Sequence, residues 1–240
     1  RHQDNPAVSD EYQKRLNQLT GVRRDRLFKG IWSGQEGAVY DLWDPAVHQI
    51  DSYEIPHEYR RIRSIDFGYT NPFVCQWWAI DPDDRMILYR ELYQSHGLVE
   101  DHAKTIAEQS DGESYEATIT DHDAEGRATL ERYGIPTTLA QKSLRSGIQS
   151  VTRRLKIAKD GKPRLILMRD ALIQTDSRLL EQQKPTSTSH EFPGYVWHRG
   201  ADVSETPVMV NDHGMDAMRY AVVYLDGLEN NSLDVRVLGQ

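Results

Sequence analysis

Three acidic positions that lie far apart in the chain have surroundings in which a carboxylate could do chemistry. Asp66 lies inside an alternating segment between two apolar residues, Asp121 follows the expected strand 115–120, and Asp216 lies in a segment with helical spacing of apolar residues. An ionised carboxylate is costly to bury without a partner, and a cation is a natural partner. Mg²⁺ and Mn²⁺ prefer hard oxygen ligands, so the three positions are candidate ligands of a divalent metal ion.

Acidic neighbours leave the ligand set open. Asp121 and Asp123 share a side of an extended segment, so both could face the site, or one of them could cap the helix expected from residue 124. Asp212 and His213 precede Asp216 by four and three residues, so all three project from one helix face. Asp212 also has the place of an ordinary helix cap, and an isolated histidine is more often structural than a metal ligand.

The residue types suit one kind of reaction. Two divalent ions about 3.5–4 Å apart can activate water and stabilise the leaving oxygen when a phosphodiester is cleaved. Three carboxylates, one of them bridging, would hold such a pair and leave coordination sites for water and phosphate. His213 could orient a ligand or shuttle a proton in the same site.

Positive charge gathers in one segment of an acidic chain. The net charge is −8, but residues 141–170 carry nine basic residues against two acidic ones. A local positive field can attract a polyanion whatever the net charge, although the same pattern could be a solvated helix face. The candidate phosphate contacts, the first two being the strongest, are Lys142, Arg145, Arg153, Arg154, Lys159 and Lys162.

The composition excludes several classes of protein. The single cysteine, Cys75, rules out an internal disulfide framework and fits a reducing compartment. No stretch approaches the roughly 18 apolar residues of a membrane span, and no signal peptide is recognisable, so no membrane partner is expected. The chain begins with Arg1, which suggests a piece of a longer protein.

The positions of these residues follow from a predicted mixed α/β sheet. Alternating apolar patterns predict three strands joined by hairpins, and helices then alternate with strands, which indicates an antiparallel side followed by parallel strands. Residues 22–58 and 181–193 show no regular pattern and are expected to be an irregular linker and a surface loop. The predicted strands are 61–67, 73–80, 86–93, 115–120, 135–140, 164–168 and 195–197, and the predicted helices are 9–21, 99–109, 124–133, 144–157, 170–182 and 212–225.

Four runs carry a resemblance to a known family. They are 64–72 (SIDFGYTNP), 120–126 (TDHDAEG), the pair Lys142-Ser143 followed by Gly147-Ile148, and 211–221 (NDHGMDAMRYA). In this order they resemble the C-terminal nuclease domain of the large terminase subunit, the DNA-packaging motor protein of tailed bacteriophages. The resemblance covers about residues 59–225, and the last run is the most specific.

The resemblance implies a ribonuclease H-like domain over 59–228 and a C-terminal tail over 229–240. The runs 17–21 and 28–32 resemble the end of the family's ATPase domain, which makes residues 1–58 its tail plus a linker. The family's metal carboxylates fall on Asp66, Asp121 and Asp216, and its histidine falls on His213. No phosphate-binding loop of the type GxxxxGK(S/T) is present, so the resemblance does not extend to ATP hydrolysis.

The implied function is cleavage of concatemeric double-stranded viral DNA during genome packaging. The resemblance implies two Mg²⁺ or Mn²⁺ ions, little sequence preference, and 5′-phosphate and 3′-hydroxyl ends. The implied partners are double-stranded DNA, the ATPase domain in cis, the portal and the small terminase subunit, at the procapsid in the host cytoplasm. Two alternatives stay open: another ribonuclease H-like nuclease, such as a junction resolvase or transposase-like enzyme, and a non-catalytic docking module that binds a motor partner through the aromatic-rich linker.

Overall fold

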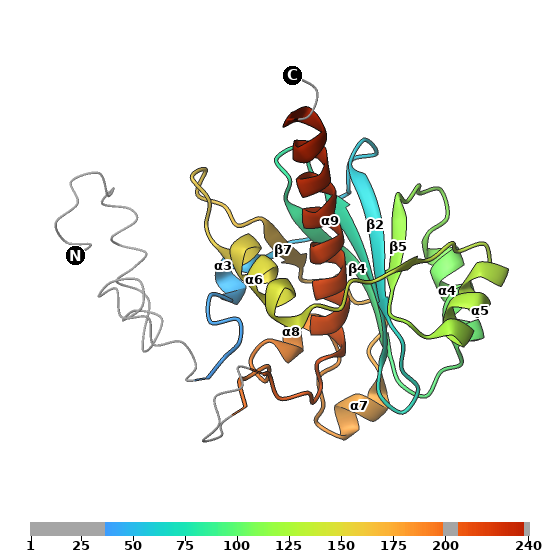
Figure 1. The fold of residues 1–240 in the computed structure, drawn as a ribbon. Coiled ribbons are helices and arrows are strands. Elements are labelled where there is room, and N and C mark those ends of the chain that lie inside the picture. Colours follow the sequence, from blue (N-terminus) through green and yellow to red (C-terminus); the bar gives the residue numbers. More distant parts are fainter. Residues whose placement is uncertain (1–36, 199–205, 238–240) are drawn as a thin grey trace.

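A mixed seven-stranded sheet forms the centre of the molecule (Figure 1). The computed structural model describes residues 37–198 and 206–237, so the predicted helix 9–21 lies outside the described residues. The strand order is β1-β7-β4-β3-β2-β5-β6, with β2, β3 and β4 antiparallel and the other neighbours parallel, which confirms the predicted mixed sheet. The strands are β1 (Gln49–Ile50), β2 (Arg60–Asp66), β3 (Phe73–Ile80), β4 (Met86–Gln94), β5 (Ala117–Thr120), β6 (Thr138–Leu139) and β7 (Leu165–Met168).

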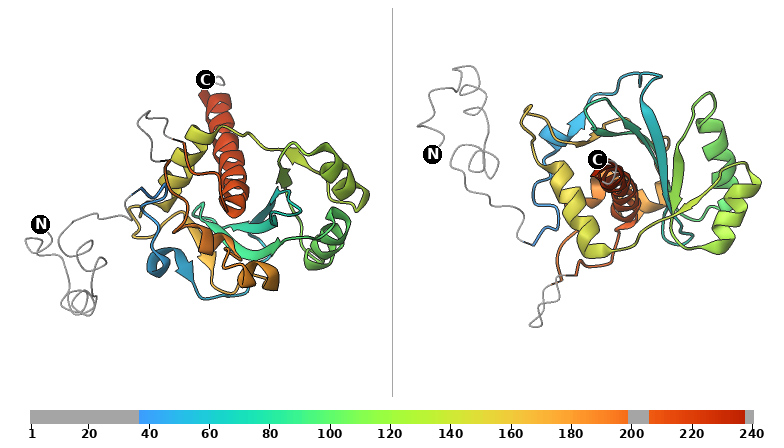
Figure 2. Two further views of the ribbon diagram at one scale, coloured as in Figure 1. Left: turned by 90° about the horizontal axis from the view of Figure 1, so that it is seen from below. Right: turned by 45° about the horizontal axis from the view of Figure 1, so that its top comes forward.

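Helices cover both faces of this sheet. As Figures 1 and 2 show, α4 and α5 lie on one side, and α6 and α9 lie on the other. The helices of the described residues are α3 (Pro45–His48), α4 (Val99–Gln109), α5 (Ala124–Arg132), α6 (Leu144–Leu155), α7 (Ser177–Glu181), α8 (Thr188–Glu191) and α9 (His213–Val237).

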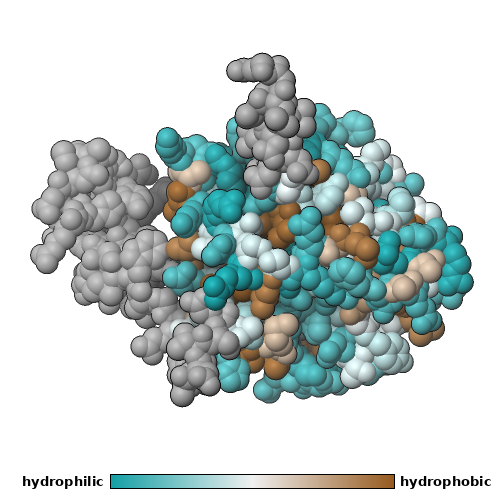
Figure 3. All heavy atoms as spheres, in the orientation of Figure 1, coloured by the Kyte–Doolittle hydropathy of each residue, from teal (hydrophilic) through white to brown (hydrophobic). Residues whose placement is uncertain are grey.

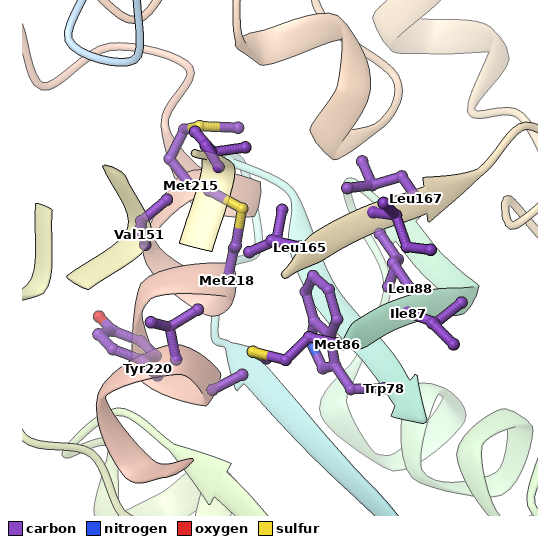
Figure 4. Packing of buried hydrophobic residues seen from close by; sticks show 14 of the residues in the cluster. Trp78, Met86, Ile87, Leu88, Val151, Leu165, Leu167, Met215, Met218 and Tyr220 are labelled. Carbon is purple, nitrogen blue, oxygen red and sulfur yellow. The ribbon is translucent and has the colours of Figure 1, made fainter. Parts of the chain in front are cut away.

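The central strand β3 is buried along its whole length because both faces of the sheet are covered. Successive side chains of a strand point to opposite faces, so Trp77 packs with the α4 and α5 side while Trp78 packs with the α6 and α9 side. Figure 4 shows Trp78 beside Met86, with Met215 and Met218 of α9 in the same apolar layer. Burial of these side chains holds α9 against the sheet.

One predicted helix is much shorter than expected. Instead of 170–182, only α7 is helical, because the Asp176 side chain caps it by accepting hydrogen bonds from the backbone of Arg178 and Leu179. Before the cap, the backbone of Ala171 and Ile173 bonds to Glu91 of β4. Pairing with the sheet therefore replaces the helical conformation there.

Two segments that were expected to be irregular take part in the domain. Residues 37–58 form α3 and the edge strand β1, and the Trp43 ring stacks on Phe192 with ring centroids 3.7 Å apart. The expected surface loop 181–193 contains α8, in which Thr188 and Glu191 are buried. The expected strand 195–197 makes only isolated bridges.

Polar residues dominate the visible surface of the described part (Figure 3), with hydrophobic residues scattered among them. In the described part, no helix has the length and apolar character needed to cross a membrane.

Candidate metal and nucleic-acid site

The three predicted acids lie at one end of the sheet. Since β2 and β5 are parallel neighbours with Ile65 opposite Thr120, Asp66 at the end of β2 and Asp121 directly after β5 lie at the same edge of the sheet. Helix α9 begins over this end and brings in Asp216 from its first turn. The carboxyl ends of parallel strands are where ligands gather in sheets of this kind.

Asp66 is the most enclosed of the three acids. Its carboxylate lies 3.0 Å from His213 Nδ1 through Oδ2 and 3.5 Å from the Tyr220 hydroxyl through Oδ1. The same hydroxyl lies 3.3 Å from Oδ2 of Asp216. One tyrosine hydroxyl is thus flanked by the two carboxylates, one from β2 and one from α9.

Asp121 and Asp216 are each paired with a cation. Lys142 Nζ lies 3.7 Å from Asp121 Oδ2, and Arg219 Nη2 donates to Asp216 Oδ1 at 2.5 Å. The guanidinium of Arg219 is buried, and its Nε and Nη1 atoms have no hydrogen-bond partner among the described residues. Arg219 therefore holds Asp216 in place, as its spacing of three residues suggests.

Burial and crowding of like charges perturb the acids. The pKa of Asp66 is raised to about 6, mainly by burial and also by the charges of Asp216 and Asp121, while the hydrogen bond from His213 opposes the shift. Burial alone would lower the pKa of His213, but the hydrogen bond to Asp66 and the surrounding acids raise it. The ionised site carries excess negative charge, which a cation would neutralise.

The two acidic neighbours take different positions. Asp123 caps α5, since its Oδ1 accepts the Gly126 N–H at 2.6 Å. Of the two alternatives for Asp121 and Asp123, the structure therefore has the one in which one of them caps the helix. Asp212 directly precedes α9, and burial raises its pKa, with the charge of Asp216 adding to the effect. Its Oδ2 atom is buried and has no hydrogen-bond partner among the described residues. Asp121 is therefore the better candidate ligand on the β5 side, and Asp212 stays a candidate beside Asp216.

The oxygen ligands of the site suit a divalent cation, although the carboxylates are hydrogen-bonded or paired with other protein groups. In the described ranges 37–198 and 206–237, no group of three His, Cys, Asp or Glu side chains is arranged to hold a metal ion. Each of the three carboxylates already has a protein partner: an ion pair or hydrogen bond comes from Lys142, Arg219, His213 or the Tyr220 hydroxyl. Metal binding would require the carboxylates to exchange these partners for the cation, and the buried Asp212 Oδ2 atom, which has no hydrogen-bond partner among the described residues, is a further oxygen that could join them.

The predicted phosphate contacts do not form one surface. Lys142 and Arg145 are exposed near the start of α6, at the acidic end of the sheet. Arg154 is wrongly predicted as a DNA contact, because its buried guanidinium lies between Asp84 at 2.9 Å and Asp226 at 2.8 Å.

The remaining basic candidates lie at or beyond the other end of α6. Helix α6 has 12 residues. It therefore separates Lys142 from the turn that holds Lys159 and Lys162 by roughly 18 Å. Arg153 is exposed near the far end of α6, 3.5 Å from Asp226. The stripe of positive charge in the sequence is divided between two ends of the fold.

Two functional candidates were missed from the sequence. Tyr220 lies one helical turn after Asp216, so the spacing of four residues could have placed it in the site. Glu191, which binds the start of α9, stands in a polar segment that carries no sequence signal of burial.

Comparisons with known proteins agree on the architecture. No protein-family model matches the sequence, and no curated protein matches it. Among solved structures, the large terminase of a thermophilic bacteriophage in complex with ADP aligns with a TM-score of 0.62 at 23% identity, over 92% of this chain and 53% of that one. The P22 large terminase nuclease domain aligns with a TM-score of 0.58 at 17% identity, over 77% of this chain and 90% of that one.

This chain has the fold of a large terminase nuclease domain. A third structure, the large terminase nuclease from thermophilic phage G20c with bound cobalt, has a TM-score of 0.50 at 12% identity, over 78% of this chain and 97% of that one. At such identities the likeness establishes the ribonuclease H-like fold, which confirms the fold predicted from the sequence. The chain spans about half the length of the ADP-bound large terminase.

Proposed function

We propose that this chain is the nuclease part of a large terminase and hydrolyses phosphodiester bonds of double-stranded DNA with divalent metal ions. The observation that carries the proposal is the convergence of Asp66, Asp121 and Asp216 at one end of a sheet with the terminase nuclease fold. The metal-bound G20c nuclease supports the metal dependence.

The roles of the side chains follow from their contacts. Asp66, Asp121 and Asp216 would hold two Mg²⁺ or Mn²⁺ ions, with Asp212 as a further candidate ligand. When bound, the ions would supply an activated water and stabilise the leaving oxygen. His213 keeps the Asp66 carboxylate oriented through Nδ1.

The exposed cations at the same end would contact the substrate. Lys142 lies close enough to Asp121 to bind a phosphate at the site, and Arg145 follows it along the start of α6. Phosphate contacts of this kind position the duplex without reading its sequence, which fits cleavage of concatemeric DNA with little sequence preference.

The wider setting is proposed from the same likeness. The resemblance assigns the residues before the described part to a linker and the tail of an ATPase domain, whereas residues 37–58 contribute α3 and β1 to the nuclease domain itself. The parent protein would cut DNA at the portal of a procapsid in the host cytoplasm, together with its ATPase domain and the small terminase subunit.

Plasmid nicking tests the proposal. We expect the chain to nick supercoiled plasmid with Mn²⁺ or Mg²⁺ and to lose this activity in EDTA and in Asp66→Ala. Asp123→Ala is the matched control, because this carboxylate caps α5 and lies outside the proposed ligand set. Full activity in Asp66→Ala would refute the site, whereas an unmodified chain that never nicks DNA would favour a docking module.

Substrate shape separates the remaining alternatives. Preference for a four-way junction over linear duplex would point to a resolvase-like enzyme of the same fold. A docking role for the aromatic segment is already weakened, because Tyr40 and Trp43 pack within the domain against Phe192.

A further inference from the structure

A buried carboxylate binds the first turn of α9 from a neighbouring element. Glu191 of α8 is 1% exposed, and its Oε1 atom accepts the Gly214 N–H at 2.9 Å while its Oε2 atom accepts the Met215 N–H at 2.8 Å. The first N–H groups of a helix have no partner within the helix. Glu191 supplies that partner from outside, at the end of α9 where negative charge is favourable.

The sheet fixes Glu191 and the start of α9 through further hydrogen bonds. The Tyr93 hydroxyl of β4 donates to Glu191 Oε1 at 2.6 Å. Gln76 Nε2 of β3 donates to the Gly214 carbonyl oxygen at 2.9 Å and to the Thr188 hydroxyl at 2.6 Å. Both sides of Gly214 are thereby tied to groups that do not belong to α9.

Close packing leaves this turn no room to shift sideways. A Cβ atom on Gly214 would lie 2.3 Å from Thr188 Oγ1, 2.9 Å from Thr188 Cα and 3.0 Å from Glu191 Oε2. Only glycine fits between α8 and the start of α9, so the helix cannot begin in another register without breaking the network.

The acidic site depends on where this turn lies. His213 immediately precedes the two N–H groups that Glu191 binds, and Asp216 immediately follows them. His213 is hydrogen-bonded to Asp66 on β2, and the Tyr220 hydroxyl lies between the carboxylates of Asp216 and Asp66. A rotation of the first turn would move both side chains away from Asp66.

We propose that Glu191 is a positioning residue for the metal site: by binding the Gly214 and Met215 N–H groups it holds His213 and Asp216 over Asp66. This inference rests on the proposed nuclease function. Each of the two Glu191 oxygens accepts one backbone N–H, whereas an amide side chain has only one accepting oxygen, so the carboxyl group is better suited than an amide to fix the turn.

A second buried glutamate provides a matched control. Glu91 of β4 is 2% exposed and also binds α8, accepting the Thr188 N–H at 3.0 Å and the Thr188 hydroxyl. These hydrogen bonds of Glu91 are made to α8, whereas Glu191 accepts two hydrogen bonds from the first turn of α9. Glu91→Gln and Glu191→Gln therefore disturb the same buried network, but only the second removes an acceptor from α9.

The test combines amide exchange with metal affinity in the whole chain. In the unmodified protein we expect the Gly214 and Met215 amides to exchange slowly, although first-turn amides normally exchange fast. Glu191→Gln turns an accepting oxygen into a donor, so exchange at these amides should accelerate and Mn²⁺ affinity, measured by calorimetry, should fall by at least about 10-fold. Glu91→Gln should leave the Mn²⁺ affinity within about twofold of the unmodified value.

Each outcome separates the inference from the proposed function. Fast exchange at both amides in the unmodified protein would overturn the inference even if Glu191→Gln fails to fold. Unchanged Mn²⁺ affinity in Glu191→Gln, or an equal loss in Glu91→Gln, would also overturn it while leaving the nuclease intact. An unmodified chain that binds no Mn²⁺ and cuts no DNA would instead defeat the proposed function, and the positioning role with it.

Discussion

Removing the charge of Asp66 should stabilise the metal-free protein while it abolishes cleavage. Burial raises the pKa of this carboxyl from 3.8 to about 6. One pKa unit corresponds to about 1.36 kcal/mol, so the ionised form at pH 8 lowers the free energy of unfolding by about 3 kcal/mol relative to a neutral side chain. Asp66→Asn keeps the shape and one accepting oxygen, and should recover up to that amount.

Because the pKa of Asp66 is higher in the folded protein than in the unfolded chain, the stability gained by Asp66→Asn depends on pH. The folded protein holds the Asp66 proton more tightly than the unfolded chain does, so the contribution of Asp66 to stability falls as the pH rises from about 4 to about 6 and is level above that. The gain of Asp66→Asn should therefore be full at pH 8 and vanish near pH 4. At both pH values Asp123→Asn should match the unmodified protein, because asparagine caps a helix as well as aspartate does.

Urea unfolding in EDTA, followed by tryptophan fluorescence, to which the buried Trp77 and Trp78 contribute, measures both effects. Equal stability of Asp66→Asn and the unmodified protein at pH 8 would refute the electrostatic reasoning. A gain of the same size at pH 4 would show that the substitution acts through packing and not through charge.

Three further results are expected. Mn²⁺ affinity should decline as the pH falls through about 6, since a protonated Asp66 is a poor ligand; calorimetry at pH 5 and 8 checks this, and a flat profile would contradict it. Arg154→Met should cost about 3 kcal/mol or more in urea unfolding with DNA affinity unchanged, and weaker binding at equal stability would restore it as a DNA contact. Lys142→Ala should reduce the salt slope of duplex binding by about 1 in fluorescence anisotropy, whereas Lys159→Ala should not, and the reverse would place the DNA at the other end of α6.

Local patterns determined most of the strands and helices of the sheet and the order in which they follow one another. The bounds of β3 and α4 are those predicted. An apolar run bounded by turn residues indicates a strand, and apolar positions at helical spacing indicate a helix, so both can be recognised from local sequence alone. The alternation of hairpins and crossovers then determined a mixed sheet. The candidate acids were found from the apolar patterns around them together with their place in the family runs, since each acid alone could also be a structural residue.

Only the tertiary structure decided which polar residues are buried and which cations are exposed. Glu191 and Thr188 stand in a segment that looks like a surface loop, and they are buried because Glu91, Tyr93 and the α9 N–H groups reach them from distant parts of the chain. Arg154 looks like its basic neighbours in the sequence, but Asp84 and Asp226 enclose it. Burial of a polar group depends on partners that can lie at any distance along the sequence, so no local period can reveal it.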